Sequence, residues 1–513
     1  MDIAALLAAL PDRISAIVRA GAARAPDAPA LNEGGRTWTY AQLAGEVDAR
    51  VALLRQLGVR GGDRVMVVGE NCVAQVALIF AAAELDAWIV NVNARLSAAE
   101  IANIREHSGA RRVLFTVAAS PEAQQHAARE GAVAHGDVMA GPLNEACLPE
   151  PVDAGNEQVA ALIYTTGTTG SPKGVMLTHR NLLFIAAVSS TLRGLTPQDR
   201  AYGVLPISHV YGLASVMFGT LYAGACLYLA PRFSAQAMLR AIGDDRLTIL
   251  QGVPAMYARL LELADKPLAS QLRFLYAGGS PLDPVLKAQV ESVFALPLHN
   301  GYGMTESSPT ISQTRLDAPR ADTSVGAVIP GVEVRIVDAG GADVPAGEAG
   351  ELWVRGPNVM KGYYREAALT AAAMRPGGWL NTGDMARQDP DGALFIVGRT
   401  KELIIRSGFN VYPLEVETAL NAHPGVAQSA VVGRALAGGN EEVVAFVETA
   451  PGQAPTEQEL RDFLAQRLSP YKCPSEIVIM KALPAAATGK ILKGRLKTLA
   501  QESPHKKLTK GDK

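Results

Sequence analysis

The segment from Tyr164 to Gly174 combines the residue types that bind phosphate groups. It reads Tyr-Thr-Thr-Gly-Thr-Thr-Gly-Ser-Pro-Lys-Gly and carries one cation, Lys173. Glycines let the backbone approach a bulky anion, hydroxyls donate hydrogen bonds, and the lysine adds positive charge. It is not a P-loop, because that motif has Gly before its Lys and Ser or Thr after it, where Pro172 and Gly174 stand here. A low-complexity linker is the alternative, but the lysine and the preceding apolar run favour phosphate binding.

A second segment, Gly301 to Glu306, places an aromatic ring, a hydroxyl and a carboxylate within six residues. Tyr302 can stack on a base, Gly303 allows close approach of a ligand, and Glu306 can bind a hard cation such as Mg²⁺. Taken alone, the segment fits a structural turn equally well.

Four further residues have a chemical and an ordinary interpretation. Asp384 ends Trp-Leu-Asn-Thr-Gly-Asp, and Arg399 begins Arg-Thr-Lys-Glu. A carboxylate accepts hydrogen bonds from two ribose hydroxyls, and an arginine can assist, although a lone acid is more often a turn residue. Lys490 follows a turn glycine, where a solvated lysine is the usual outcome. His209 lies in Leu-Pro-Ile-Ser-His-Val-Tyr-Gly and could equally be a buried core histidine.

Together and in this order, the segments resemble those of the adenylate-forming superfamily of acyl-CoA synthetases, luciferases and peptide-synthetase adenylation domains. The segment at Tyr164 resembles its phosphate-binding signature, and five further segments match between there and Lys490. The resemblance implies an AMP-forming acid–thiol ligase, an acyl-CoA synthetase.

The resemblance also implies roles for individual residues. Lys490 stabilises charge between carboxylate and α-phosphate, His209 gates the acyl pocket, and Thr305 meets the α-phosphate. ATP is bound by Thr165, Thr166, Gly167, Thr168, Thr169, Lys173, Gly279, Ser280, Asn300, Gly301, Tyr302, Asp384 and Arg399. Mg²⁺ is held by Thr165 and Glu306, and Gly408 lines the tunnel that binds the pantetheine arm of CoA. Lys401 is the hinge residue about which the C-terminal domain rotates. The acyl pocket is lined by Tyr211, Ser215, Met256, Tyr276, Gly278, Gly303 and Met304.

The implied reaction has two halves. A carboxylate is first transferred to AMP with release of pyrophosphate, and a thiol then displaces AMP. Because the halves need different groups, a rotating C-terminal domain that exchanges Lys490 for Gly408 is the expected solution. ATP, Mg²⁺ and coenzyme A are the expected cofactors and substrates.

Several alternatives stay open. The thiol acceptor is either CoA or a carrier protein, although no carrier serine motif follows Lys490, and Tyr211–Ser215 lacks the acid of a peptide-synthetase domain. A luciferase-like oxygenase and a catalytically silent nucleotide-binding protein are further candidates. Tyr211 and Ser215 fit an aryl acid, and a medium-chain fatty acid is equally compatible. The pocket segments show no arginine of the kind that a short dicarboxylate would need.

The elements that position these residues read as alternating strands and helices. Apolar runs at 65–68, 112–115, 160–164, 248–250 and 272–276 are separated by helical patterns, which indicates parallel sheets with crossover helices. Residues 332–337 and 351–355 alternate with period two, which indicates a small antiparallel unit. We therefore predict an α/β fold, with an N-terminal domain (1–398) of two βαβ-type subdomains plus a small β-barrel, and a mobile α+β C-terminal lid (399–513).

Composition sets the outer limits. A chain of 513 residues is too long for one core. A net charge of −2 provides no global basic field for nucleic acid or a membrane surface. The four scattered cysteines predict reduced thiols, and the N-terminus has an acid where a signal peptide carries bases, so we expect a cytoplasmic protein. Its expected partners are small molecules, and a homodimer is left open.

Overall fold

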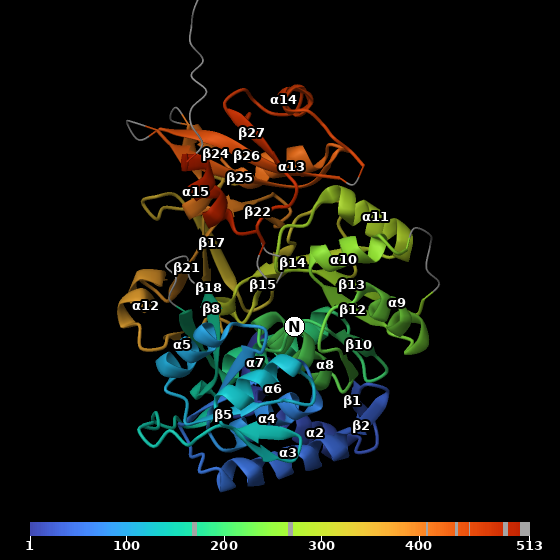
Figure 1. Cartoon of the computed structure of the whole chain (residues 1–513), viewed down its shortest axis with the longest axis vertical. Coiled ribbons are helices and arrows are strands. Elements are labelled where there is room, and N and C mark those ends of the chain that lie inside the picture. Colours follow the sequence, from blue (N-terminus) through green and yellow to red (C-terminus); the bar gives the residue numbers. More distant parts are fainter. Residues whose placement is uncertain are drawn as a thin grey trace, which may run out of the picture. The chain divides into compact units, whose positions relative to one another are not determined.

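The protein was examined as a computed structural model that describes residues 1–166, 172–264, 270–406, 409–436, 440–450, 452–485 and 491–502 (Figure 1). The chain divides into two compact units. The larger unit contains Met1–Arg335, Trp353–Thr382 and Pro390–Leu394, and the smaller unit contains Ile336–Leu352, Gly383–Asp389 and Phe395–Lys513. Because the division falls within several strands, the single boundary expected at residue 398 stays a prediction.

One sheet of the larger unit carries the predicted phosphate segment. Its eight strands lie in the order β19-β9-β8-β4-β3-β5-β7-β6. They are β3 (Arg64–Gly69), β4 (Trp88–Asn93), β5 (Arg112–Phe115), β6 (Val133–His135), β7 (Val138–Ala140), β8 (Val159–Thr166), β9 (Pro172–Thr178) and β19 (Gly362–Tyr363). The predicted runs at 65–68, 112–115 and 160–164 form β3, β5 and β8 of the parallel centre β5-β3-β4-β8. Strand β4 was not predicted, and β9 returns antiparallel to β8.

A second sheet of nine strands has the order β16-β15-β14-β13-β12-β10-β11-β1-β2. Its strands are β1 (Pro29–Glu33), β2 (Arg36–Thr39), β10 (Arg200–Gly203), β11 (Cys226–Leu229), β12 (Ile249–Gly252), β13 (Phe274–Ala277), β14 (Leu298–Gly303), β15 (Thr310–Gln313) and β16 (Ala327–Val328). The centre is again parallel, and β15 turns back antiparallel on β14. Both sheets are therefore mixed, which adds antiparallel edges to the predicted parallel arrangement.

Helices pack on these sheets. They are α1 (Ile3–Ala9), α2 (Ala16–Arg24), α3 (Tyr40–Gln56), α4 (Val73–Glu84), α5 (Ala98–Ser108), α6 (Pro121–Arg129), α7 (His179–Leu192), α8 (Gly219–Tyr222), α9 (Ala235–Asp244), α10 (Pro254–Leu261), α11 (Pro284–Phe294) and α12 (Ala367–Ala373), with short 3₁₀ turns η1 (Gly155–Glu157) and η3 (Thr305–Ser307). The segment η2 (Tyr211–Phe218) is a π-helix. Helices α9, α10 and α11 lie beside β12 and β13 and share a buried cluster with them (Figure 1).

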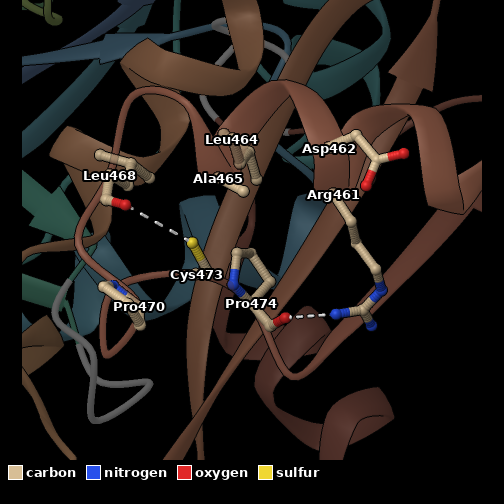
Figure 2. Close-up of a pocket in the computed structure, with 8 residues that line it drawn as sticks. All are labelled: Arg461, Asp462, Leu464, Ala465, Leu468, Pro470, Cys473 and Pro474. Carbon is tan, nitrogen blue, oxygen red and sulfur yellow. Dashed lines mark hydrogen bonds between the residues drawn. The ribbon is translucent and has the colours of Figure 1, made fainter.

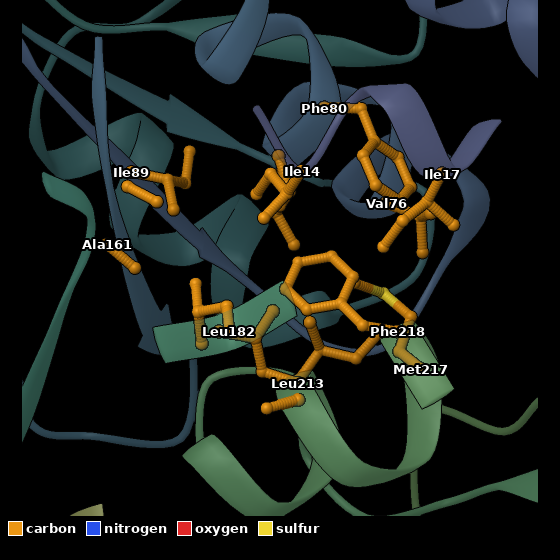
Figure 3. Close-up of a cluster of buried hydrophobic side chains, with 14 of the residues drawn as sticks. Ile14, Ile17, Val76, Phe80, Ile89, Ala161, Leu182, Leu213, Met217 and Phe218 are labelled. Carbon is orange, nitrogen blue, oxygen red and sulfur yellow. The ribbon is translucent and has the colours of Figure 1, made fainter. Parts of the chain in front are cut away.

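The largest core lies where α4, α7 and η2 meet. Phe80 of α4 and Phe218 of η2 have ring centroids 5.6 Å apart, and Leu182 of α7 belongs to the same cluster (Figure 3). Helix α4 is buried on all sides from Val73 to Ala83, so its uniformly apolar sequence marks a core helix. No helix in the described ranges is long and apolar enough to cross a membrane.

The smaller unit has its own core. Strands β25 (Val426–Ala435), β26 (Glu441–Thr449) and β27 (Glu476–Met480) form a sheet, and β23 (Ile404–Arg406) pairs with β24 (Phe409–Val411). Helices α13 (Pro413–Asn421), α14 (Glu457–Ala465) and α15 (Lys493–Glu502) complete it. The smaller unit also contains η4 (Thr400–Glu402). Strand β20 (Met374–Arg375) belongs to the larger unit, and four strands have residues in both units: β17 (Glu333–Val337), β18 (Gly350–Arg355), β21 (Trp379–Gln388) and β22 (Leu394–Arg399). The α/β class with a separate C-terminal domain is confirmed.

Candidate active site

The predicted phosphate segment is the connection between β8 and β9. Thr165 lies opposite Lys173 and Tyr164 opposite Gly174 in an antiparallel register. The two strands therefore hold the ends of the segment side by side. Gly167, Thr168 and Thr169 lie outside the described residues, and the side chain of Thr166 is also not described.

Lys173 and Glu306 are brought together by a tyrosine that the sequence analysis missed. The Tyr363 hydroxyl donates a 2.8 Å hydrogen bond to Oε1 of the buried Glu306, and the Lys173 Nζ lies 5.5 Å from the centroid of the Tyr363 ring. Tyr363 reaches this place because β19 pairs with β9, with Tyr363 opposite Val175. Burial, and then the charge of Glu306, hold the pKa of Tyr363 far above its usual value, so its hydroxyl stays protonated and donates.

Glu306 and Thr165 are residue types that hold Mg²⁺ in sites where the ion also binds substrate phosphates, and their joint role as metal ligands stays a prediction. The backbone carbonyl of Glu306 accepts a hydrogen bond from the Met360 N–H at 2.9 Å, which helps to fix its position. One carboxylate and one hydroxyl are few protein ligands, but Mg²⁺ in phosphate-handling sites takes its other ligands from phosphates and water. Within the described ranges no group of three or more His, Cys, Asp and Glu residues could form a complete protein cage.

The predicted ATP-binding residues Gly279, Ser280 and Asn300–Tyr302 lie at or next to neighbouring strand ends. Ala277 of β13 pairs with Asn300 of β14, so Gly278 and Gly279 follow one strand beside Gly301 on the other. The carboxyl ends of parallel strands are the usual place for ligands in α/β sheets. Gly279 has a φ of +83°, a conformation that favours glycine, and Ser280 next to it is exposed.

The residues of β14 that are predicted to bind ATP or the acyl group also make contacts within the protein itself. The Asn300 side chain donates to the carbonyls of Thr323 and Ser324, each at 3.2 Å. Tyr302 is half-buried and pairs with Ser312. A Cβ on Gly301 would lie 1.8 Å from the Tyr276 hydroxyl, and one on Gly303 would lie 1.7 Å from the Pro309 carbonyl oxygen. These glycines are therefore required by the packing of the protein itself.

The predicted acyl wall is partly assembled around two tyrosines. Tyr211 of η2 and Tyr276 of β13 have ring centroids 6.2 Å apart, and a Cβ on Gly278 would lie 3.4 Å and 3.3 Å from their respective Cε1 atoms. Met256 of α10 packs near Gly252, with its sulfur 3.5 Å from the position of a Cβ there. Met304 is half-buried beside the buried Thr305.

Ser215 and His209 differ in exposure. The Ser215 hydroxyl is buried and lies 3.2 Å from that of Thr310. His209 is exposed and its Nδ1 accepts from the Tyr211 N–H at 3.3 Å, so it is not the core histidine that the sequence left open. Its gating role stays a prediction.

Arg193 is a second residue that the sequence analysis missed. It follows α7, where a cation at a helix end is ordinary, and no matched motif includes it. It is fully buried, and its Nη1 donates to the Ser215 carbonyl at 3.1 Å. Contacts between segments far apart in the chain create this environment, so no local pattern could have indicated it.

The smaller unit holds the predicted ribose pair. Arg399 Nε lies 3.1 Å from Oδ1 of the buried Asp384, which joins β21 to β22. Lys401 is exposed in η4, next to Glu402, which accepts from Lys493 at 2.7 Å. Lys493 also lies 2.8 Å from Glu417, so α15, η4 and α13 meet at one ion pair network. Gly408 and Lys490 lie outside the described residues.

A pocket in the same unit contains none of the predicted site residues. Figure 2 shows that Leu464, Leu468 and Cys473 line one part of it, and that Arg461 donates to the Pro474 carbonyl, at 2.7 Å. The hydrogen bonds of Arg461 connect α14 to the segment before β27. This pocket is therefore not part of the candidate active site.

Comparison with known proteins agrees with this fold. The family model for AMP-binding enzymes matches residues 18–364, and that for the AMP-binding enzyme C-terminal domain matches residues 415–490. The chain belongs to the AMP-binding enzyme family, within the adenylate-forming superfamily, and its class is that of an AMP-forming acid–thiol ligase.

Individual relatives match over nearly their whole length. A feruloyl-CoA synthase from Amycolatopsis sp. is 37% identical over 92% of this chain and 96% of its own. A 4-coumarate–CoA ligase 2 from Oryza sativa subsp. japonica is 34% identical over 93% and 90%, respectively. The solved o-succinylbenzoate coenzyme A synthetase from Bacillus subtilis, in complex with ATP and a magnesium ion, has a TM-score of 0.82 at 29% identity and covers 95% of this chain and 99% of that one.

Proposed function

We propose that the chain is an ATP-dependent carboxylate–CoA ligase that acts on an aryl carboxylic acid. The observation that carries the proposal is the arrangement of Lys173, Tyr363 and Glu306 beside the phosphate segment. A cation and an oriented carboxylate beside a phosphate-binding segment support the proposal, because a triphosphate and its counterion need both. The relatives named feruloyl-CoA synthase and 4-coumarate–CoA ligase support the acceptor and the aryl class.

In the first half-reaction, a carboxylate oxygen of the acid attacks the α-phosphorus of ATP, and pyrophosphate leaves. Lys173 balances negative charge on the phosphates, and Glu306, oriented by Tyr363, together with Thr165 would hold Mg²⁺. The ion would supply charge neutralisation of the phosphate oxygens. We assign Lys490 to the developing charge between the carboxylate and the α-phosphate, and Asp384 with Arg399 to the ribose.

In the second half-reaction, the CoA sulfur attacks the acyl carbon, the thiol proton is lost, and AMP leaves. AMP is a far better leaving group than oxide, which is why the acid must first be adenylated. Tyr211, Tyr276 and Gly278 support an aryl acyl group, since two rings flank a position without a side chain.

The test uses a panel of aryl and aliphatic acids with the full chain. Pyrophosphate exchange into ATP should depend on the acid, and addition of CoA should convert the adenylate to a thioester, with the highest kcat/KM for an aryl acid. Exchange without thioester formation on CoA would instead indicate a carrier protein as the acceptor, and exchange that is independent of any acid would contradict the proposal.

A further inference from the structure

Arg193 is a buried cation held by neutral groups. Its side chain has no exposure to solvent, and Nη1 donates to the Ser215 carbonyl at 3.1 Å and to Gln251 Oε1 at 2.6 Å. The guanidinium carbon lies 4.5 Å from the centroid of the Tyr276 ring. A cation over an aromatic face is stabilised, but this does not replace a counterion.

The described residues offer Arg193 no acidic partner. Its Nε and Nη2 atoms have no hydrogen-bond partner there, and neither do the nearby Gln251 Nε2 and the Tyr211 hydroxyl. Three of these four atoms can only donate, and the tyrosine hydroxyl can also donate. A buried cation costs much free energy unless it is paired, and an acceptor from outside the chain would supply the missing partner.

Arg193 and its unpartnered neighbours lie beside the wall of the expected acyl pocket. Arg193 is bonded to the backbone of Ser215, one helical turn from Tyr211 on η2. Tyr276, whose ring lies under the Arg193 guanidinium, also contacts Tyr211 edge to face, and both tyrosine rings border Gly278. The π-helix turns that carry Ser215 and Tyr211 therefore connect the buried guanidinium to the pocket wall, and π-helical turns recur at functional sites.

We propose that Arg193 recognises an oxygen acceptor, a carboxylate or a phenolic oxygen, at the end of the acyl substrate remote from the reacting carboxylate. This inference rests on the proposed function and names its substrate class more narrowly. A carboxylate would pair with the two unpartnered nitrogens of the guanidinium fork, whereas a phenolic oxygen would accept from one of them.

A purely structural role is the alternative, because Arg193 also ties α7 to η2 and β12. That role uses only Nη1, and it would affect all substrates equally. If Arg193 instead recognises the oxygen acceptor, its loss changes the ratio of kcat/KM between an acid that bears the acceptor and one that lacks it. The ratio of kcat/KM values is therefore the decisive measurement.

The experiment compares cinnamate with 4-hydroxycinnamate and 4-carboxycinnamate, and hexanoate with adipate, as substrates of the full chain with ATP and CoA. We expect the acceptor-bearing acid of at least one set to exceed its plain partner by about tenfold or more. Arg193→Met and Arg193→Lys should lower the ratio of kcat/KM between the acceptor-bearing and the plain acid by about tenfold, whatever either change does to kcat/KM for the plain acid. Whether the carboxylate-bearing or the phenol-bearing acid gives the larger increase in kcat/KM tells which oxygen Arg193 recognises.

Arg259→Met is the matched control, since Arg259 lies on the exposed face of α10 and its ion pair with Glu262 is at the surface. The Arg259→Met variant should show the same ratio of kcat/KM between acceptor-bearing and plain acids as the parent chain. If Arg193 variants do not fold, the parent's ratios decide the matter alone. Preference for plain acids, or an unchanged preference in folded Arg193 variants, overturns the proposal but leaves the ligase function standing. Failure of every acid to support pyrophosphate exchange contradicts the ligase function itself.

Discussion

At the scale of single residues, the contact between Tyr363 and Glu306 gives the most direct prediction. Tyr363→Phe removes only the hydroxyl that holds Glu306 Oε1 at 2.8 Å. We expect the Mg²⁺ concentration for half-maximal pyrophosphate exchange to rise about tenfold, because the carboxylate loses its orientation. Glu306→Gln should lower the exchange rate by a further factor of ten or more, since the charge itself is lost. An unchanged Mg²⁺ dependence in Tyr363→Phe would contradict the assignment of Glu306 to the metal.

His179 provides a prediction about pH and stability. Its Nδ1 accepts from the Ile14 N–H at 3.2 Å, and burial lowers the pKa of His179 to about 3. The unfolded histidine has a pKa of about 6.5, so between about pH 6.5 and 3 the unfolded chain binds the extra proton. The stability that neutral His179 contributes is therefore complete above pH 6.5 and is lost as the pH falls through this window.

His179→Asn can keep the acceptor and removes the titration. Between pH 7.5 and 5.0 the parent chain should lose about 2 kcal/mol more in free energy of unfolding than the variant, as measured by urea denaturation. Equal losses in both proteins would show that His179 is not held neutral.

At the scale of elements, the turn from β14 to β15 is fixed by glycine. A Cβ on Gly303 would lie 1.7 Å from the Pro309 carbonyl oxygen, and backbone cannot move aside as a side chain can. We expect Gly303→Ala to lower the free energy of unfolding by about 1–3 kcal/mol and to reduce pyrophosphate exchange, because the turn carries Thr305 and Glu306.

The matched control is Gly243→Ala in α9, where a new Cβ meets nothing within 4 Å. That change should stabilise the helix by about 0.5–1 kcal/mol. If the two variants had the same stability in urea, close packing at Gly303 would not be the reason for its glycine.

Elements with a strong local pattern could be predicted from the sequence. The apolar run at 65–68 became the buried centre of β3, and the run at 160–164 became part of β8, because short continuous apolar segments favour buried strands. The site residues that could not be predicted, Tyr363 and Arg193, depend on partners 57 and 58 residues away in Glu306 and Gln251. Their residue types are unremarkable locally, and only the folded chain gives them partners.

At the scale of the whole molecule, the two half-reactions should be separable. Lys490→Ala should abolish acid-dependent pyrophosphate exchange, because the charge that forms at the α-phosphate loses its cation. Thioester formation from a supplied acyl adenylate and CoA should continue, since that half-reaction is assigned to other groups. Equal loss of both activities would contradict the assignment.

The central claim is that ATP is split to AMP to drive formation of a thioester. It is tested most directly by counting products when the full chain is given an aryl acid, ATP, Mg²⁺ and CoA. We expect AMP, pyrophosphate and acyl-CoA in equal amounts, with none formed when the acid is omitted. Formation of ADP and phosphate, or of AMP without the acid and without a thioester, would contradict it.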